Sequence, residues 1–141
     1  MLIGISPLVG PDLLRALAAM GHGDEIAFVD ANYPAEEHAR RLIRADGIGL
    51  CAMLEAVLPL FPLDHATSPI LRTGEGNDPA IRAAIHDGLD ALFARFAPRD
   101  AVRPLGGADF YPRVRAAHMV VATGERALYA NVILRKGVIP P

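Results

Sequence analysis

One histidine, His22, lies between two glycines in the segment Gly21-His22-Gly23-Asp24. Glycines permit unusual backbone angles and leave space around the ring, so a small ligand could approach it. Because histidine gains and loses protons near neutral pH, it suits general acid/base catalysis. Asp24 follows closely, and Asp30 lies at the far end of the next segment. The residue types alone favour a simpler interpretation, in which His22 and Asp24 only hydrogen-bond the turn.

A second group of polar residues lies near the end of the chain, where Tyr129 and Asn131 are two positions apart on an expected strand. This spacing places both side chains on one face of the strand. Polar groups on an apolar strand need hydrogen-bond partners, which either a hydroxyl-rich ligand or water at a sheet edge could supply. Arg113, just after Tyr111-Pro112, is by itself typical of a surface arginine.

Several other kinds of site are disfavoured. The five histidines show no metal-binding spacing, so we expect no metal. Gly21-His22-Gly23 fails as a dinucleotide fingerprint, because Ile26 occupies the third glycine position and the segment precedes a strand. Gly74-Glu75-Gly76 lacks the Gly-Lys-Ser/Thr of a phosphate-binding loop. Cys51, the only cysteine, lies in an apolar segment and is expected to be an inert thiol.

The overall composition narrows the class of protein further. With 141 residues the chain fits one domain, residues 1–141. A formal net charge of -2 and the lack of a basic stripe argue against nucleic acid as a partner. No apolar run is long enough to span a bilayer, and the first residues do not resemble a signal peptide, so we expect a cytoplasmic protein. The 52% hydrophobic content hints at self-association.

The elements that must position these residues alternate between helix and strand. Apolar spacing and proline or glycine boundaries predict helices over 10–21, 48–60, 78–96 and 108–116. Short apolar runs predict strands over 25–30, 40–44, 69–73 and 101–103. Asp78-Pro79 is expected to begin the clearest helix, and 119–122 with 128–134 to form a terminal hairpin. The fold class is therefore α/β: one compact mixed α/β domain, with several short strands flanked by helices.

The order of the motifs along the chain is more specific than any one of them. It resembles the D-ribose pyranase / L-fucose mutarotase family, and the L-fucose mutarotase branch most closely, from Ile5 to Val138. The resemblance is carried by Ile5-Ser6-Pro7-Leu8, Met20-Gly21-His22-Gly23-Asp24-Glu25-Ile26, Asp30-Ala31-Asn32-Tyr33-Pro34, Ile43-Arg44-Ala45-Asp46-Gly47, Pro59-Leu60-Phe61-Pro62-Leu63-Asp64, Phe110-Tyr111-Pro112-Arg113, Thr123-Gly124-Glu125-Arg126-Ala127 and the segment from Tyr129 to Val138.

This resemblance implies an isomerase that interconverts the cyclic forms of a free monosaccharide and needs no cofactor. It implies a homo-oligomer, commonly a decamer of two stacked pentameric rings, with the sugar site between neighbouring subunits. His22 matches the catalytic histidine and Asp30 a sugar-binding aspartate. Arg113 falls at a substrate-contacting arginine, and the triplet Tyr129, Ala130 and Asn131 matches the terminal substrate-binding segment.

We therefore expect a mutarotase that opens and recloses the hemiacetal of L-fucose by general acid/base catalysis. His22 would exchange the proton, with Tyr129 as a second proton carrier, and Asp30 would either orient His22 or bind a sugar hydroxyl. Alternatives are a D-ribose pyranase, since Ala130 also occurs in the ribose branch, and a non-catalytic sugar-binding module. The segment 65–109 matches the family poorly, so the sugar stays open.

Overall fold

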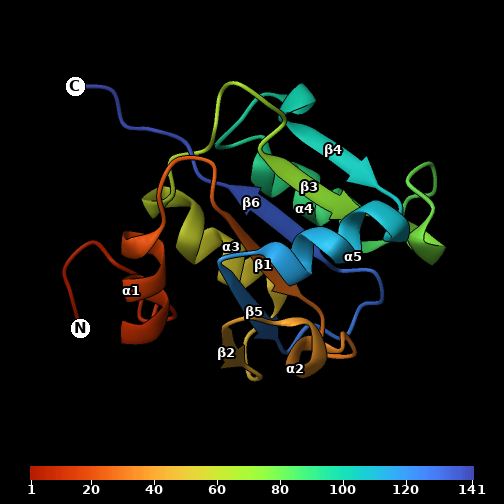
Figure 1. Ribbon diagram of the computed structural model, residues 1–141, viewed down its shortest axis with the longest axis horizontal. Helices are drawn as coiled ribbons and strands as arrows, with labels where there is room; N and C mark the ends of the chain where they lie inside the picture. The colour runs from red at the N-terminus through yellow and green to blue at the C-terminus, as the bar shows by residue number, and fades with distance from the viewer.

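The computed structural model describes residues 1–141 and places one six-stranded sheet between two layers of helices (Figure 1). The helices are α1 (Pro11–Ala19), α2 (Ala35–His38), α3 (Leu50–Val57), α4 (Ile85–Phe93) and α5 (Gly107–Ala116). The strands are β1 (Glu25–Val29), β2 (Leu42–Ala45), β3 (Ile70–Thr73), β4 (Val102–Leu105), β5 (Met119–Thr123) and β6 (Val132–Arg135). Three short 3₁₀ helices complete the chain: η1 (Leu58–Leu60), η2 (Glu75–Asn77) and η3 (Arg99–Ala101).

The strand order in the sheet is β2-β5-β1-β6-β3-β4. β6 runs antiparallel to both of its neighbours, β1 and β3, while the other pairs are parallel. The strands β1, β3 and β5 therefore end at one edge of the sheet, where β6 begins. We call this the carboxyl edge and the opposite one the amino edge. Loops at the carboxyl edge of such a sheet are the usual place for ligand binding.

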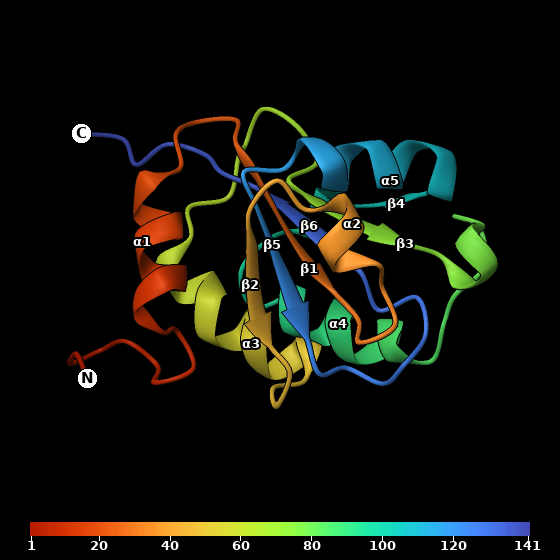
Figure 2. The same ribbon diagram turned by 60° about the horizontal axis from the view of Figure 1, so that its bottom comes forward.

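The two faces of the sheet are covered by different helices (Figure 2). One face packs with α1, α3 and α4 in the larger core cluster, and the other packs with α2 and α5. Because side chains alternate along a strand, Ile26 and Phe28 join the first core while Ala27 and Val29 join the second. This explains why β1 is apolar from Ile26 to Val29, as predicted. None of the helices has the length and apolar character needed to cross a membrane.

The mixed α/β class and most of the predicted elements are confirmed. The expected helix over 48–60 is α3 followed by η1, and its apolar residues Leu50, Leu54 and Val57 are fully buried in the chain's own core. That segment is apolar nearly all round because it packs inside the molecule. The expected strands over 40–44 and 101–103 are shifted by one or two residues, to β2 and β4.

The predicted terminal hairpin is wrong. β5 and β6 do not pair, because β1 lies between them, parallel to β5 and antiparallel to β6. β5 and β6 both have apolar side chains on their two faces, as β1 does, so no local pattern distinguishes a pairing with β1 from a pairing with each other. In consequence Tyr129 and Asn131 lie in the loop before β6, and not on one face of a strand.

The predicted start of a helix at Asp78 is also wrong, since α4 begins only at Ile85. The Asp78 carboxylate accepts a hydrogen bond from the Ala80 amide at 2.9 Å, and the Asp78 carbonyl accepts one from the Ile81 amide at 3.1 Å. An aspartate followed by proline can close a local turn as readily as it can cap a helix. Here the turn packs against Gly74, where a β-carbon would collide with the Asp78 carbonyl.

Candidate active site

The turn that carries His22 is fixed at the amino edge by its backbone. The Gly21 amide donates to the Asp24 carboxylate at 2.8 Å, and the Gly23 amide donates to the Lys136 carbonyl at 2.8 Å. The Lys136 amide in turn donates to the Asp24 carbonyl at 2.9 Å. Gly23 adopts a φ of +85°, a conformation that favours glycine. The turn is thus rigid while the His22 side chain stays 56% exposed.

His22 faces a carboxylate that the sequence analysis gave no role. Its Nε2 lies 3.6 Å from Oδ2 of Asp64, whose side chain is only 5% exposed. The Ala66 amide and the Arg135 guanidinium donate to Asp64 at 2.9 and 3.0 Å. These two hydrogen bonds lower the pKa of the Asp64 carboxyl. Asp64 is therefore an ionised group held beside the exposed imidazole.

The same ionic network continues to Arg113. The second carboxylate is Glu25, at the start of β1, which accepts a hydrogen bond from Nη1 of Arg113 at 2.8 Å. Arg135 lies between the two carboxylates, with Nη1 3.7 Å from Oε1 of Glu25. Burial raises the pKa of Glu25, although both arginines counteract it. We refer to His22, Glu25, Asp64, Arg113 and Arg135 as the His22 cluster.

At the carboxyl edge, Asp30 and Asn131 bind each other directly. The Asp30 amide donates to Oδ1 of Asn131 at 3.0 Å, and Nδ2 of Asn131 donates to Oδ2 of Asp30 at 3.1 Å. The Asn32 amide donates to the other carboxylate oxygen at 2.9 Å. Asp30 and Asn131 are 5% and 6% exposed. Burial raises the pKa of Asp30, and its hydrogen bonds with Asn32 and Asn131 oppose that effect.

Tyr129 lies next to this pair in a left-handed conformation, with a φ of +58°. Such a conformation is costly for a tyrosine and requires support from its surroundings. The support comes from Thr73 at the end of β3, whose hydroxyl donates to the Tyr129 carbonyl at 2.8 Å. The Thr73 amide also donates to the Asn131 carbonyl at 3.2 Å, and the intervening Ala130 is fully buried. We refer to Asp30, Thr73, Tyr129, Ala130 and Asn131 as the Asn131 cluster.

Three aromatic side chains with no role predicted from the sequence lie beside the loop that follows Asp30. The rings of Tyr33, His38 and Tyr111 pack against one another at centroid distances of 5.3 to 5.9 Å. Arg115 donates to Nε2 of His38 at 2.9 Å, so Nδ1 carries the proton and donates to the Tyr33 hydroxyl at 2.9 Å. Tyr33 and Asp30 also line a cavity of about 260 Å³.

The structure divides the predicted site residues between the two clusters. His22 and Arg113 lie at the amino edge, and Asp30, Tyr129, Ala130 and Asn131 lie at the carboxyl edge. The five residues of β1 separate His22 from Asp30, which at about 3.3 Å per residue is roughly 17 Å. One copy of the chain therefore cannot bring both clusters to one monosaccharide.

Of the described residues, no three histidine, cysteine or carboxylate side chains are grouped so that they could hold a metal ion. The chemistry available at the two clusters is acid/base exchange at His22 and hydrogen bonding at Asp30 and Asn131. Asp64, Glu25 and Thr73 complete these clusters; Asp64 and Glu25 stood in motifs that the sequence singled out, and Thr73 stood in none.

The chain is similar to proteins of one known family and to solved structures. Residues 3–139 match the family model described as the RbsD / FucU transport protein family. The chain is similar to the fucose mutarotase of Streptococcus pneumoniae, solved in complex with L-fucose. The TM-score is 0.90 and the identity 38%, covering 99% of this chain and 100% of that chain.

FucU from Bifidobacterium longum is also similar, with a TM-score of 0.90, 35% identity and coverage of 97% of this chain and 99% of that one. RbsD of Bacillus subtilis, solved with D-ribose, has a TM-score of 0.74 and 20% identity, covering 99% and 100% of the two chains. At that identity the likeness concerns the fold alone.

Proposed function

The chain belongs to the RbsD / FucU transport protein family, and we propose that it is a monosaccharide mutarotase that interconverts the α and β anomers of free L-fucose. The similarity to a fucose mutarotase at 38% identity supports this substrate over D-ribose. The observation that carries the proposal is the exposed His22 imidazole beside the ionised Asp64, at 3.6 Å.

The reaction requires two proton transfers. The anomeric hydroxyl loses its proton while the ring oxygen gains one, the ring opens, and the reverse steps close it on the other carbonyl face. His22 suits this exchange because an imidazole both accepts and donates protons near neutral pH. Asp64 stabilises the protonated imidazole and orients the ring, since it is itself fixed by Arg135 and the Ala66 amide.

Sugar binding is assigned to the Asn131 cluster. Asp30 and Asn131 present carboxylate and amide groups that accept and donate hydrogen bonds, as sugar hydroxyls require. Because Asp64 occupies the position beside His22, Asp30 is free to bind a hydroxyl. The Tyr129 hydroxyl makes no hydrogen bond within the chain and is assigned as the second proton carrier or a donor to the anomeric oxygen.

The two clusters lie at opposite edges of the sheet, so we propose that the working site forms between two copies of the chain. The His22 cluster of one copy would meet the Asn131 cluster of the next, in a decamer of two stacked pentameric rings. Exposed apolar side chains support extensive contacts between copies, since they lie at both chain ends and beside Tyr129: Met1, Leu2, Ile3, Leu128, Val138 and Ile139.

The proposal is tested by saturation-transfer NMR of L-fucose with the wild-type protein and His22→Gln. We expect accelerated exchange between the anomers with wild type and its loss with His22→Gln, because glutamine carries no titratable proton. His118→Gln is the matched control, since the His118 side chain makes no hydrogen bond or ion pair. Full activity of His22→Gln would contradict the mechanism.

The same experiment separates the alternatives. Sugar binding without accelerated exchange would identify a non-catalytic binding module. Exchange between ring sizes of D-ribose, with no effect on L-fucose anomers, would identify a pyranase. Both outcomes would contradict the proposed activity.

A further inference from the structure

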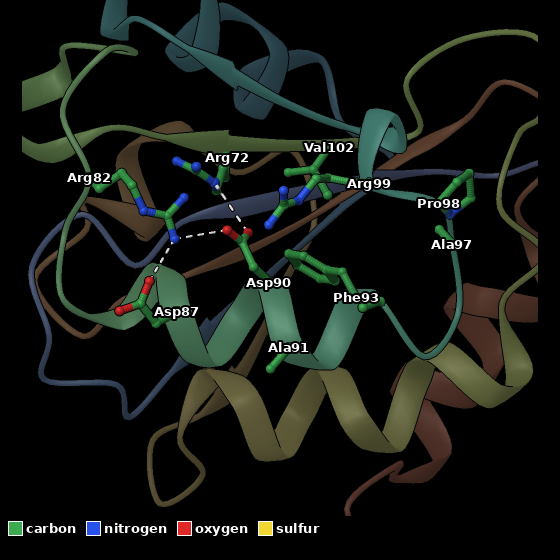
Figure 3. A pocket seen from close by; sticks show the side chains of 11 residues that line it. Arg72, Arg82, Asp87, Asp90, Ala91, Phe93, Ala97, Pro98, Arg99 and Val102 are labelled. Carbon is green, nitrogen blue, oxygen red and sulfur yellow. Dashed lines mark hydrogen bonds and ion pairs between the residues drawn. The ribbon is translucent and has the colours of Figure 1, made fainter.

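A large cavity lies on the face of the sheet that α4 covers, next to the Asn131 cluster but lined by none of the residues of either cluster (Figure 3). Its volume is about 780 Å³, within the range of small-molecule sites. Arg72 of β3, Asp87 and Asp90 of α4, and two further arginines, Arg82 and Arg99, line it. Ala97, Pro98 and Val102 supply an apolar wall. Neither His22 nor the Asn131 cluster contributes to this cavity.

The buried wall of the cavity contains Arg72, which is only 6% exposed. Its Nη1 donates to Nδ1 of His86 at 3.0 Å and to the Thr73 carbonyl at 3.4 Å, which holds the guanidinium in one orientation. Nδ1 of His86 also accepts from the Ala83 amide at 3.1 Å, so this ring is neutral. Burial and the charge of Arg72 lower the pKa of His86. His86 thus fixes Arg72 without neutralising it.

The positive charge of the cavity is incompletely balanced. Nε of Arg72 is buried and makes no hydrogen bond, and its nearest carboxylate oxygen, on Asp90, lies 3.9 Å away. Asp90 is bound more closely by Arg82, at 2.8 Å, and Arg82 also pairs with Asp87 at 2.8 Å. Arg99 makes no ion pair, and Figure 3 shows its side chain directed toward the same carboxylate.

A buried guanidinium whose nearest counter-ion is too distant for a hydrogen bond is costly, so an added anion would stabilise the cavity. Arginine binds phosphate well because its planar fork donates two parallel hydrogen bonds. The carboxylates of Asp87 and Asp90 repel a simple anion but accept hydrogen bonds from hydroxyl groups. A ligand that satisfies both sets of groups carries a phosphate at one end and hydroxyls at the other.

We propose that this cavity binds a small phosphorylated sugar or polyol, with the phosphate between Arg72 and Arg99 and hydroxyls on Asp87 and Asp90. The carbon chain of the ligand lies along the apolar wall. The proposal does not rest on the mutarotase activity, since the cavity shares no side chain with either cluster.

The test is isothermal titration of the intact protein with D-ribose 5-phosphate and L-fucose 1-phosphate. Free L-fucose is present at saturating concentration, so that the proposed sugar site stays occupied. We expect binding in the millimolar range or tighter, and a weakening of roughly tenfold or more in Arg99→Ala, because one charge-assisted hydrogen bond is lost. Arg99 is exposed, so this variant folds normally.

Arg95→Ala is the matched control, because Arg95 is exposed, pairs with Glu55 and does not line the cavity. Arg72→Met tests the contribution of the buried arginine to binding. If that variant does not fold, the affinity of Arg99→Ala decides the test. The proposal is overturned by no binding of either sugar phosphate or by unchanged affinity in Arg99→Ala. It is also overturned if inorganic phosphate binds as tightly as the sugar phosphates, because the carboxylates would then have no role.

Discussion

The two clusters differ in how they are built. In the His22 cluster the imidazole is 56% exposed and is surrounded by ionised side chains. In the Asn131 cluster the polar groups of Asp30 and Asn131 are almost completely buried and bind each other by short hydrogen bonds. An exposed imidazole can reach a ligand on another molecule, whereas a buried pair holds hydroxyl partners in a fixed geometry.

This difference fits the proposed site, in which one copy of the chain exchanges the proton and the next copy binds the sugar. In the proposed mechanism, proton exchange needs a group that water and substrate both reach, and this role is assigned to the His22 cluster. Recognition of the proposed sugar needs donors and acceptors that do not move, and this role is assigned to the Asn131 cluster. Because each copy has both clusters at opposite edges, the proposed ring of copies would repeat the same contact between an amino edge and a carboxyl edge.

The largest expected effect tests whether the clusters act together across copies. His22→Gln and Asp30→Asn are each expected to be inactive alone, because each removes one half of every site. When the two variants are co-expressed, about a quarter of the contacts in random mixed rings join two intact clusters. Exchange of L-fucose anomers should therefore return, as measured by saturation-transfer NMR.

The control for this mixing experiment is co-expression of His22→Gln with Asp64→Asn. Both changes lie in the His22 cluster, so no contact in the mixed rings joins two intact clusters and activity should stay absent. Equal activity in the two mixtures, or none in the first, would show that the site is not shared between copies.

The next effect concerns the stability of the buried cluster. Asn131→Ala leaves the Asp30 amide and one oxygen of its carboxylate without their partner, which should cost about 1–3 kcal/mol of unfolding free energy. His22→Gln is the comparison, because an exposed side chain contributes little and its stability should match wild type. Urea denaturation of both variants measures the difference, and equal stabilities would show that the buried pair is not structurally important.

Much of this arrangement followed from the sequence, because it depends on local patterns. The apolar run of β1 and the glycines around His22 determined the strand and the turn, and both were predicted correctly. The pairing of β1 between β5 and β6 depends on contacts across the whole chain, which no local pattern records. For that reason the terminal hairpin and the common strand face of Tyr129 and Asn131 were wrong.

The residues that contact His22 and Tyr129 could not be predicted from the sequence for a related reason. Asp64 is 42 positions from His22, and Thr73 is 56 positions from Tyr129, so only the folded sheet edges bring them together. Thr73 had no motif around it at all. The sequence therefore predicts which groups could react, while the groups that orient them appear only in the structure.

A smaller effect is expected at Thr73. Thr73→Val keeps the shape of the side chain but removes the hydroxyl that supports the left-handed Tyr129, so about 0.5–1.5 kcal/mol of support is lost. We expect the KM for L-fucose to rise severalfold while kcat changes less, because the Asn131 cluster mainly binds. Thr73→Ser keeps the hydroxyl and should behave as wild type in the same NMR assay. A drop in kcat alone would show that Tyr129 acts mainly as the second proton carrier and contributes little to binding.

The smallest effect is a difference in pH dependence between the two carboxylates. Burial raises the pKa of Asp30, so its favourable contribution to folding is complete below the pKa of an unfolded aspartate and is lost as pH rises through the higher folded pKa. Hydrogen bonds from Ala66 and Arg135 lower the pKa of Asp64, so its contribution is present above the unfolded pKa and is lost as pH falls through the lower folded pKa. Carbon-13 NMR titration of the carboxyl groups should place Asp30 above and Asp64 below an ordinary aspartate. If the order of the two pKa values were reversed, the Asn131 cluster would stabilise the negative charge of Asp30. The proposed distinction between a binding edge and a proton-exchanging edge would then fail.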